Sequence, residues 1–256
     1  MNKRYLFAAP FIVFMLTFVV LPLLILFWSA IYDDGFTMRF FVALSNDGVA
    51  ATVFWRSIWV SFVCSVIALL IAYPIAYLLA TSSARTGSTI LMLFIMPMWI
   101  NTLLRTMALE QLFNAFGFTF GYSTLIASLI IAYLPFVILP IYVVLRNINK
   151  KYFEASYDLG ATPTQTFVKT ILPLSIPGVV SGFLLIFVPA VSTYFFSARM
   201  GNPETPMLGE LLNQYQQQGL YGPGSALAIT LLVIVAISVA ATNKFTKIGN
   251  KKGGLW

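Results

Sequence analysis

The stretch "FEASYDLGATPTQTFVKTILPLSIPG" (residues 153–178) is the most water-compatible segment in the second half of an otherwise apolar chain. It lies between two long hydrophobic runs, which a plain loop would join equally well. Its first part predicts a short helix over 152–159, because Glu154 falls in the first turn, where a carboxylate suits the helix dipole. Gly160 is placed to adopt the left-handed conformation that ends such a helix.

A second helix is predicted directly after the first. Thr162 stands where an N-cap is needed, Pro163 suits the first helical position, and Gln165 completes a capping-box pattern. Pro173 and Pro177 are expected to close this unit and to start the next apolar run. A short helix held between two stiff elements has a shape that a soluble partner can grip, although the same caps also suit a loop that has no partner.

The composition of the whole chain predicts a membrane protein. Of its 256 residues, 59% are hydrophobic and only 9% are charged, whereas a soluble domain typically has about 25% charged residues. The single cysteine, Cys64, excludes an intramolecular disulfide. The chain has no histidine, which is the usual general base and the commonest metal ligand. We therefore expect neither a catalytic residue nor a metal site.

Six windows of low charge are long enough to cross a bilayer. About 20 apolar residues cross the hydrocarbon core as a helix, and helices are forced there because the backbone must be hydrogen-bonded internally. The first window is far longer than the roughly 7–15-residue core of a signal peptide, so we interpret it as a retained helix. The predicted fold is therefore all-α, with six transmembrane helices. The windows are 5–31, 57–80, 88–109, 124–145, 176–198 and 224–242.

The distribution of charge predicts the orientation of these spans. Lys and Arg accumulate on the cytoplasmic side of membrane proteins. One set of loops and tails holds Lys3, Arg4, Arg85, Arg146, Lys150, Lys151, Lys169, Lys244, Lys247, Lys251 and Lys252, and the other holds Arg39, Arg56, Arg105 and Arg199. We therefore expect both termini and the 147–175 segment in the cytoplasm. This topology accounts for the net charge of +7 without a nucleic-acid partner.

The 153–178 stretch also carries a known motif. Glu154-Ala155, a glycine six residues after the glutamate, and Leu172-Pro173 resemble the EAA loop of binding-protein-dependent (MetI-like) ABC importer permeases, with Ser156 and Thr170 as departures from the common pattern. In that family the loop is the coupling helix, which sits in a groove of the ATPase subunit. The resemblance implies an ATPase-coupling role for Glu154, Ala155, Ser156, Leu159, Gly160, Leu172 and Pro173.

The resemblance extends along most of the chain. The segments 96–109 and 133–161 are similar to the spermidine/putrescine permeases, whereas 215–226 lacks the acidic and aromatic stretch expected in those proteins. The likeness implies an N-terminal helix and external turn over 1–51, a permease core over 52–244 and a basic cytoplasmic tail over 245–256. It also implies three partners in the inner membrane system: an ABC ATPase dimer, a second homologous permease and an extracytoplasmic solute-binding protein.

The chain has no glycine-rich phosphate loop. We therefore expect ATP and magnesium on the partner ATPase and no cofactor on this chain.

Candidate substrate contacts lie in the third window. Trp99, Asn101 and Glu110 are near its outer half, and Arg105 is its only charge before Glu110. An amide buried in hydrocarbon needs a partner, so Asn101 is expected to face the bundle or a water-filled path. Trp99 suits cation–π contact with an ammonium group, but a tryptophan is equally typical of a membrane interface. Arg105 is expected to pair with Glu110 or with the partner permease, or to extend toward the surface.

The external loops offer two further features. Asp33 and Asp34 form an acidic pair that suits either a solvated turn or contact with a cation or a basic partner. A short helix ending at Gly219 is predicted to lie on the membrane or over the entrance of the bundle. Its apolar face consists of Met207, Leu208, Leu211, Leu212 and Tyr215.

The sequence therefore predicts the permease subunit of an ATP-driven importer, with polyamines as the substrate. Import of another small solute, such as an inorganic ion or an amino acid, remains open within the same architecture. A self-sufficient secondary transporter is a third possibility, and it would need intramembrane charges or broken half-helices around an ion site. The windows 57–80, 124–145, 176–198 and 224–242 contain no charged residue, which argues against that class.

Overall fold

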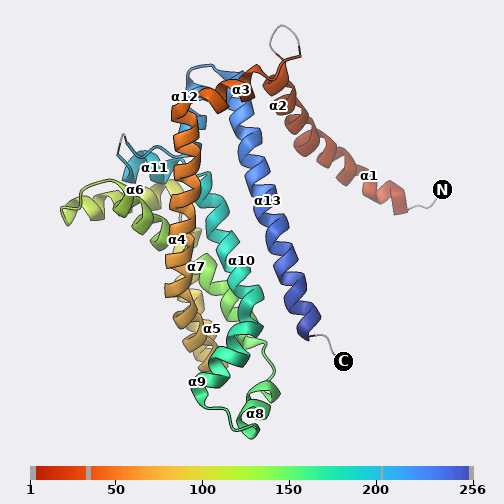
Figure 1. Cartoon of the computed structure of the whole chain (residues 1–256), viewed down its shortest axis with the longest axis vertical. Coiled ribbons are helices and arrows are strands. Elements are labelled where there is room, and N and C mark those ends of the chain that lie inside the picture. The colour runs from red at the N-terminus through yellow and green to blue at the C-terminus, as the bar shows by residue number, and fades with distance from the viewer. Residues whose placement is uncertain (1–3, 33–35, 203, 254–256) are drawn as a thin grey trace.

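Helices make up almost all of the described chain (Figure 1). The structure is a computed structural model that describes residues 4–32, 36–202 and 204–253. Within these ranges the only strand-like feature is an isolated bridge between Tyr32 and Phe36. The all-helical prediction is confirmed.

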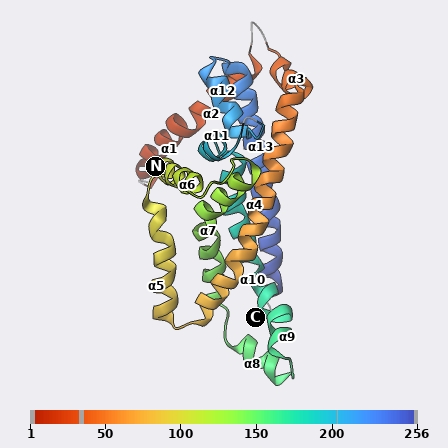
Figure 2. The same cartoon turned by 90° about the vertical axis from the view of Figure 1, so that its left-hand side faces the viewer.

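The helices are these, in chain order: α1 (Arg4–Met15), the π-helical turn η1 (Leu16–Val20), α2 (Leu21–Ile31), α3 (Arg39–Asn46), α4 (Gly48–Thr81), α5 (Ala84–Ile95), the 3₁₀ turn η2 (Met96–Trp99), α6 (Thr102–Ala115), α7 (Tyr122–Arg146), α8 (Lys151–Asp158), α9 (Pro163–Thr166), the π-helical turn η3 (Phe167–Ile171), α10 (Leu172–Val191), α11 (Phe195–Met200), α12 (Leu208–Gln217) and α13 (Tyr221–Gly253). In both views α8 lies at one end of the bundle, here called the α8 end, and α12 lies at the other, the α12 end (Figures 1 and 2).

Five helical stretches in the described part of the chain are long and apolar enough to cross a membrane unbroken: Pro10–Ile31, Gly48–Thr81, Tyr122–Arg146, Pro163–Val191 and Tyr221–Thr242. The sixth predicted window, 88–109, is not one straight span. It forms two helical segments, Ala84–Trp99 and Thr102–Ala115, bent by 97° at the break between them. Figure 2 shows α5 beside the lower half of α4, with α6 turned across the bundle. The count is therefore five, or six if the bent pair crosses as one span.

The bend arises from local backbone chemistry. Ile100 is extended, with φ −75° and ψ 136°, so the helix ends there. Asn101 then caps a new helix by accepting a hydrogen bond from the Leu103 N–H at 2.8 Å. Asparagine is among the best N-cap residues. A hydropathy window averages over this single cap, so it does not reveal that a new helix begins there.

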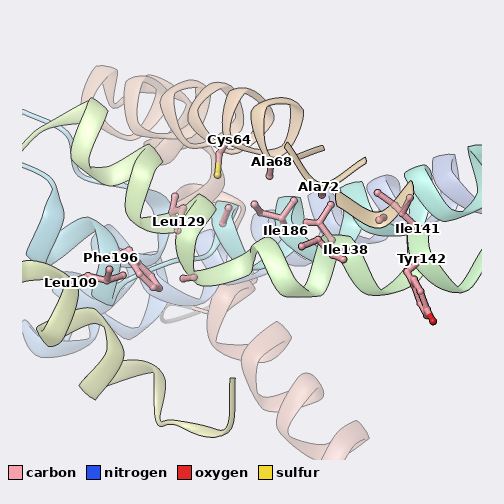
Figure 3. Close-up of a cluster of buried hydrophobic side chains, with 14 of the residues drawn as sticks. Cys64, Ala68, Ala72, Leu109, Leu129, Ile138, Ile141, Tyr142, Ile186 and Phe196 are labelled. Atoms are coloured by element: carbon pink, nitrogen blue, oxygen red, sulfur yellow. The ribbon is translucent and has the colours of Figure 1, made fainter. Parts of the chain in front are cut away.

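The core lies between α4, α7 and α10. Small residues line the buried face of α4, and Ala68 and Ala72 pack near Leu129, Ile138 and Ile186 (Figure 3). On α10, Gly178 and Gly182 lie close to α7: a Cβ at Gly178 would lie 3.0 Å from the carbonyl oxygen of Pro140. Glycines four residues apart permit this approach of two membrane helices, which gain van der Waals contact in place of a hydrophobic driving force.

The first apolar helix lies apart from this core. Residues 10–31 are long enough to span a membrane, yet none of the most apolar window is buried within the chain. Figure 1 shows α1 and α2 leaning away from the bundle, with α2 next to α13. The described contact includes a 2.6 Å hydrogen bond between the hydroxyls of Ser29 and Ser225. The apolar surface of this helix therefore needs lipid or another protein to cover it.

The helix predicted before Gly219 forms, and it packs against the end of the bundle. Met207 and Leu208 are fully buried, and Leu211 is buried against apolar residues of α4, α10 and α13. The Leu208 N–H donates to Ser57 Oγ at 2.8 Å. The apolar face of α12 therefore packs largely within this chain, in agreement with the expected placement against the bundle rather than with the alternative of a membrane-surface helix.

Candidate functional site

The predicted coupling loop forms a helical hairpin at the α8 end. The first helix, α8, spans Lys151–Asp158 and carries Glu154 in its first turn. Gly160 ends it with a φ of +79°, the left-handed conformation that favours glycine. A Cβ at Gly160 would meet nothing within 4 Å. The predicted helix and its glycine terminator are therefore both confirmed.

The second helix starts with the predicted capping box. Thr162 Oγ1 accepts from the Gln165 N–H at 3.3 Å, and Gln165 Oε1 accepts from the Thr162 N–H at 3.0 Å. The helix does not close at Pro173 and Pro177, as the sequence suggested, but continues through η3 into α10 as one stretch, Pro163–Val191. A local π-helical turn can re-satisfy backbone groups that a proline leaves free in a membrane helix. The loop is therefore rigidly continuous with a membrane span.

Most motif residues are open to a partner. Glu154, Ala155, Leu159, Gly160, Leu172 and Pro173 are exposed, and no residue of α8 is buried. Leu159 is 88% exposed. Ser156 differs from the others: it is partly buried, and its hydroxyl bonds Thr166 Oγ1 at 2.9 Å.

A cavity of about 690 Å³ lies beside α8. The ends of α4, α7 and α8 line it with both apolar and charged side chains, among them Tyr77, Arg146, Lys150 and Glu154. Arg146 Nη1 donates to Ala80 O at 2.7 Å and to Ser82 O at 3.0 Å. It therefore satisfies carbonyl groups at the C-terminus of α4, which the helix itself leaves unpaired. This contact ties the α4–α5 corner to the start of the coupling loop.

The candidate path residues lie on the bent pair. Trp99 is 91% exposed at the bend. Asn101 is exposed, and its side chain serves as the N-cap of α6. Glu110 pairs across the fold with Arg199 of α11, with 3.2 Å between Oε2 and Nη1. Pairing of Glu110 with Arg105, one of the arrangements expected for Arg105, does not form among the described residues, and Arg105 Nε is buried there without a hydrogen-bond partner. Asp33 and Asp34 lie outside the described residues.

A second cavity, of about 750 Å³, lies between α4 and the start of α7 and was not predicted. Its walls include Trp55, Arg56, Trp59 and Tyr122, and the Arg56 guanidinium lies 6.0 Å from the centre of the Tyr122 ring. This distance is at the limit of a cation–π contact. The sequence does carry a signal for this cavity: two tryptophans one helical turn apart with an arginine between them.

Comparison with known proteins identifies the family. Residues 72–247 match the family described as the inner membrane component of binding-protein-dependent transport systems. This chain belongs to that family. The family is that of ABC importer permeases, which are not themselves enzymes.

The permease is similar over most of its length to characterised relatives. It is 26% identical to the spermidine/putrescine transport system permease protein PotB of Escherichia coli (strain K12), over 92% of this chain and 94% of PotB. It is 35% identical to the inner membrane ABC transporter permease protein YdcU of the same strain, over 53% of this chain and 46% of YdcU. The resemblance to this permease family that the sequence motifs predicted is confirmed.

The fold of the permease also matches a solved importer. A bacterial alginate ABC transporter, solved with a periplasmic protein bound to an alginate pentasaccharide, contains a chain that superposes with a TM-score of 0.72. The identity is 17%, and 95% of each chain is covered. At this identity the likeness concerns the fold alone. The permease is thus a multi-pass protein of an inner-membrane importer family.

Proposed function

We propose that this permease forms half of the translocation path of an ATP-driven importer of spermidine and putrescine, with a second homologous permease forming the other half. The observation that carries the proposal is the hairpin at the α8 end. Its motif residues are exposed, and its second helix continues into a membrane span without interruption. A displacement imposed on the hairpin by a soluble ATPase would therefore act directly on α10.

Both termini and the α8 end are assigned to the cytoplasm, with six crossings of the membrane. The fold supports this orientation because Arg85, Arg146, Lys150, Lys151 and Lys169 lie on loops and helix ends near α8, as expected for a cytoplasmic surface. An impermeant amine reagent added to intact cells should leave Lys150 and Lys151 unmodified and should label them once the membrane is permeabilised. Labelling in intact cells would contradict the orientation.

Two features of this chain point to its partners: its sequence has no glycine-rich phosphate loop, and its α8 hairpin is exposed. The energy source is an ABC ATPase dimer that holds ATP and magnesium and grips α8. An extracytoplasmic binding protein delivers the solute at the α12 end. ATP binding would draw two coupling loops together and shift the population of the permease pair toward an outward-open arrangement.

Polyamine as the substrate is supported by the similarity to PotB, which is described as a spermidine/putrescine permease. The exposed Trp99 ring is suited to an ammonium group. One observation favours a different small solute: the unpredicted cavity near the α12 end is lined by Arg56 and by no carboxylate among its lining residues. A positive charge on that surface would repel a polycation and attract an anion.

Reconstitution of the complete importer separates these candidates. The purified complex, with its second permease, ATPase and binding protein, is placed in liposomes and given radiolabelled spermidine. ATP should drive uptake, and excess unlabelled putrescine should compete. ATP-driven uptake of radiolabelled phosphate or glutamate that excess spermidine does not inhibit, with no uptake of spermidine, would assign another solute. Uptake driven by an ion gradient without ATP would contradict the importer itself.

A further inference from the structure

One aromatic residue joins the coupling loop to α4. Phe167, the first residue of η3, lies between Tyr73 and Tyr77, which are one turn apart on α4. Its ring centre is 5.9 Å from that of Tyr73 and 5.3 Å from that of Tyr77, and it meets both at nearly right angles. Edge-to-face contacts at these distances are favourable for aromatic rings. We call these three residues the aromatic clasp.

A hydrogen bond reinforces the aromatic clasp about two turns further along the Pro163–Val191 helix. Tyr73 Oη lies 2.8 Å from Ser175 Oγ, and Ser175 is fully buried. The Ser175 hydroxyl donates its single proton to Leu172 O at 2.9 Å, so Tyr73 is the donor to Ser175. The inner part of α4 is therefore held at two points of the Pro163–Val191 helix, one at the start of its π-helical segment and one beyond it.

The aromatic clasp is connected to α8 through the residue that precedes Phe167. Thr166, which precedes Phe167, is buried and shares a 2.9 Å hydrogen bond with Ser156 of α8. A displacement of α8 therefore reaches Phe167 through one hydrogen bond and one peptide link. π-Helical turns inside α-helices are often found at functional sites, and this turn lies between the hairpin and the membrane span.

The clasp contacts α4 where that helix is most easily bent. Pro74 lies between Tyr73 and Tyr77 in the last third of α4. A proline inside a helix removes one backbone hydrogen bond, so bending there is less costly than elsewhere. At the far end of the same helix are Trp55 and Trp59, which line the cavity near α7. A force applied at the clasp would therefore move the last turns of α4 relative to the part that carries this cavity.

We propose that Phe167 is a positioning residue that makes α4 follow α8 and α10 when the ATPase moves the coupling loop. Without its ring, α10 would still move with the hairpin, because the helix is continuous, but α4 would no longer be drawn with it. ATP would then be hydrolysed with little solute imported. The inference rests on the coupling role proposed for α8.

The experiment measures solute imported per ATP hydrolysed by the reconstituted complex. Phe167→Ala should assemble with the ATPase and hydrolyse ATP, but its import per ATP should fall about tenfold, within the usual range for coupling between two sites. Phe183→Ala is the matched control, because Phe183 makes an edge-to-face contact with Phe62 between the same two helices, away from the coupling loop. It should keep the wild-type ratio.

Two milder variants keep the test decisive if Phe167→Ala fails to assemble. Tyr77→Phe retains the ring and should keep the wild-type ratio. Tyr73→Phe retains the ring but loses the bond to Ser175, so its ratio should fall about threefold, the factor that one such hydrogen bond typically contributes.

The outcomes separate the clasp from the proposed function. Equal ratios for Phe167→Ala and Phe183→Ala would overturn the role of the clasp, as would an unchanged ratio in Tyr73→Phe when Phe167→Ala cannot be assembled. Failure of the proposed function appears elsewhere: the wild-type complex would then show no ATP-driven import, or Gly160→Asp would import normally with its ATPase bound.

Discussion

The two ends of the molecule each carry a short amphipathic helix, and these two helices differ in how far they are buried by the rest of the chain. At the α12 end, Leu208, Gly209 and Leu211 are buried against α4, α10 and α13. At the α8 end, no residue of α8 is buried, and Leu159 beyond it is almost fully exposed. One helix is stabilised by its own chain, whereas the other leaves its surface free for a partner.

The hydrogen bonds of the two ends differ in the same sense. The α12 end is joined to distant segments: Leu208 N–H donates to Ser57 of α4, and Thr124 of α7 donates to Met200 O at 2.9 Å. The bonds that shape the α8 hairpin, namely the capping box at Thr162 and the Ser156–Thr166 pair, join near neighbours. An element held by local bonds can move as a unit, which suits a part that receives force. The α12 end is built to keep its shape while that force is applied.

The largest effect in this comparison is expected from Gly209→Ala. A Cβ at Gly209 would overlap the carbonyl oxygens of Ser192 and Thr193, which are backbone atoms and cannot rotate away. Overpacking of this kind should lower the free energy of unfolding by about 3 kcal/mol or more. The measurement is the thermal unfolding midpoint of the detergent-solubilised permease, followed by intrinsic tryptophan fluorescence.

Gly160→Ala is the matched change at the α8 end. Its Cβ has open space, so only the positive φ opposes it, at a cost of about 1 kcal/mol. A Gly160→Ala variant less stable than Gly209→Ala would show that the α8 end, and not the α12 end, is the tightly built one.

The next largest effect is a loss of function without loss of the fold, expected for Gly160→Asp. Aspartate tolerates the left-handed conformation better than most residues, so backbone strain should be modest and the permease should still insert. The new carboxylate would lie in the contact with the ATPase, where an unpaired desolvated charge costs several kcal/mol. We expect the ATPase to dissociate, or to hydrolyse ATP without responding to loaded binding protein. The measurements are co-purification of the ATPase and stimulated ATP hydrolysis.

Gly160→Ala again provides the control, because it introduces the strain without the charge. It should retain ATPase binding and most of the uptake. Wild-type import by Gly160→Asp, with the ATPase still bound, would mean that residues 153–160 are not the coupling helix.

The two ends also differ in how well the sequence predicted them. The α8 hairpin follows from neighbours in sequence: Gly160 needs a positive φ, and Thr162 and Gln165 cap each other. The packing of α12 depends on residues far away in the chain, such as Ser57, so periodicity found the helix but not what it packs against. The Arg199–Glu110 pair was missed for the same reason. The bend at Ile100 was missed because hydropathy averages over a window and ignores one cap.

A smaller effect is expected at the bend, which lies between the two ends (Figure 2). Trp99→Ala removes a side chain that is 91% exposed, so the stability of the permease should be unchanged. If the ring contacts a polyamine, uptake should fall about three- to tenfold, since a partly desolvated cation–π contact is worth on the order of 1 kcal/mol. Phe116→Ala is the control, because Phe116 is 72% exposed at the other end of α6. Equal uptake by wild type and Trp99→Ala would remove Trp99 from the path.

The smallest effect is expected for Glu110→Gln. Its partner Arg199 is 47% exposed and Glu110 is 24% exposed, and ion pairs this open to water contribute less than about 1 kcal/mol to stability. The informative quantity is spermidine uptake in a double-mutant cycle with Arg199→Gln.

If Glu110 serves only to hold α6 against α11, both single variants should have the same small effect, and the double variant should be no worse than either. If Glu110 also contacts the cationic solute, Glu110→Gln should lower uptake more than Arg199→Gln does. Arg199→Gln could even raise uptake, because it would free the carboxylate for the substrate. Equal uptake in all four proteins would mean that the Glu110–Arg199 pair joins α6 to α11 without affecting transport.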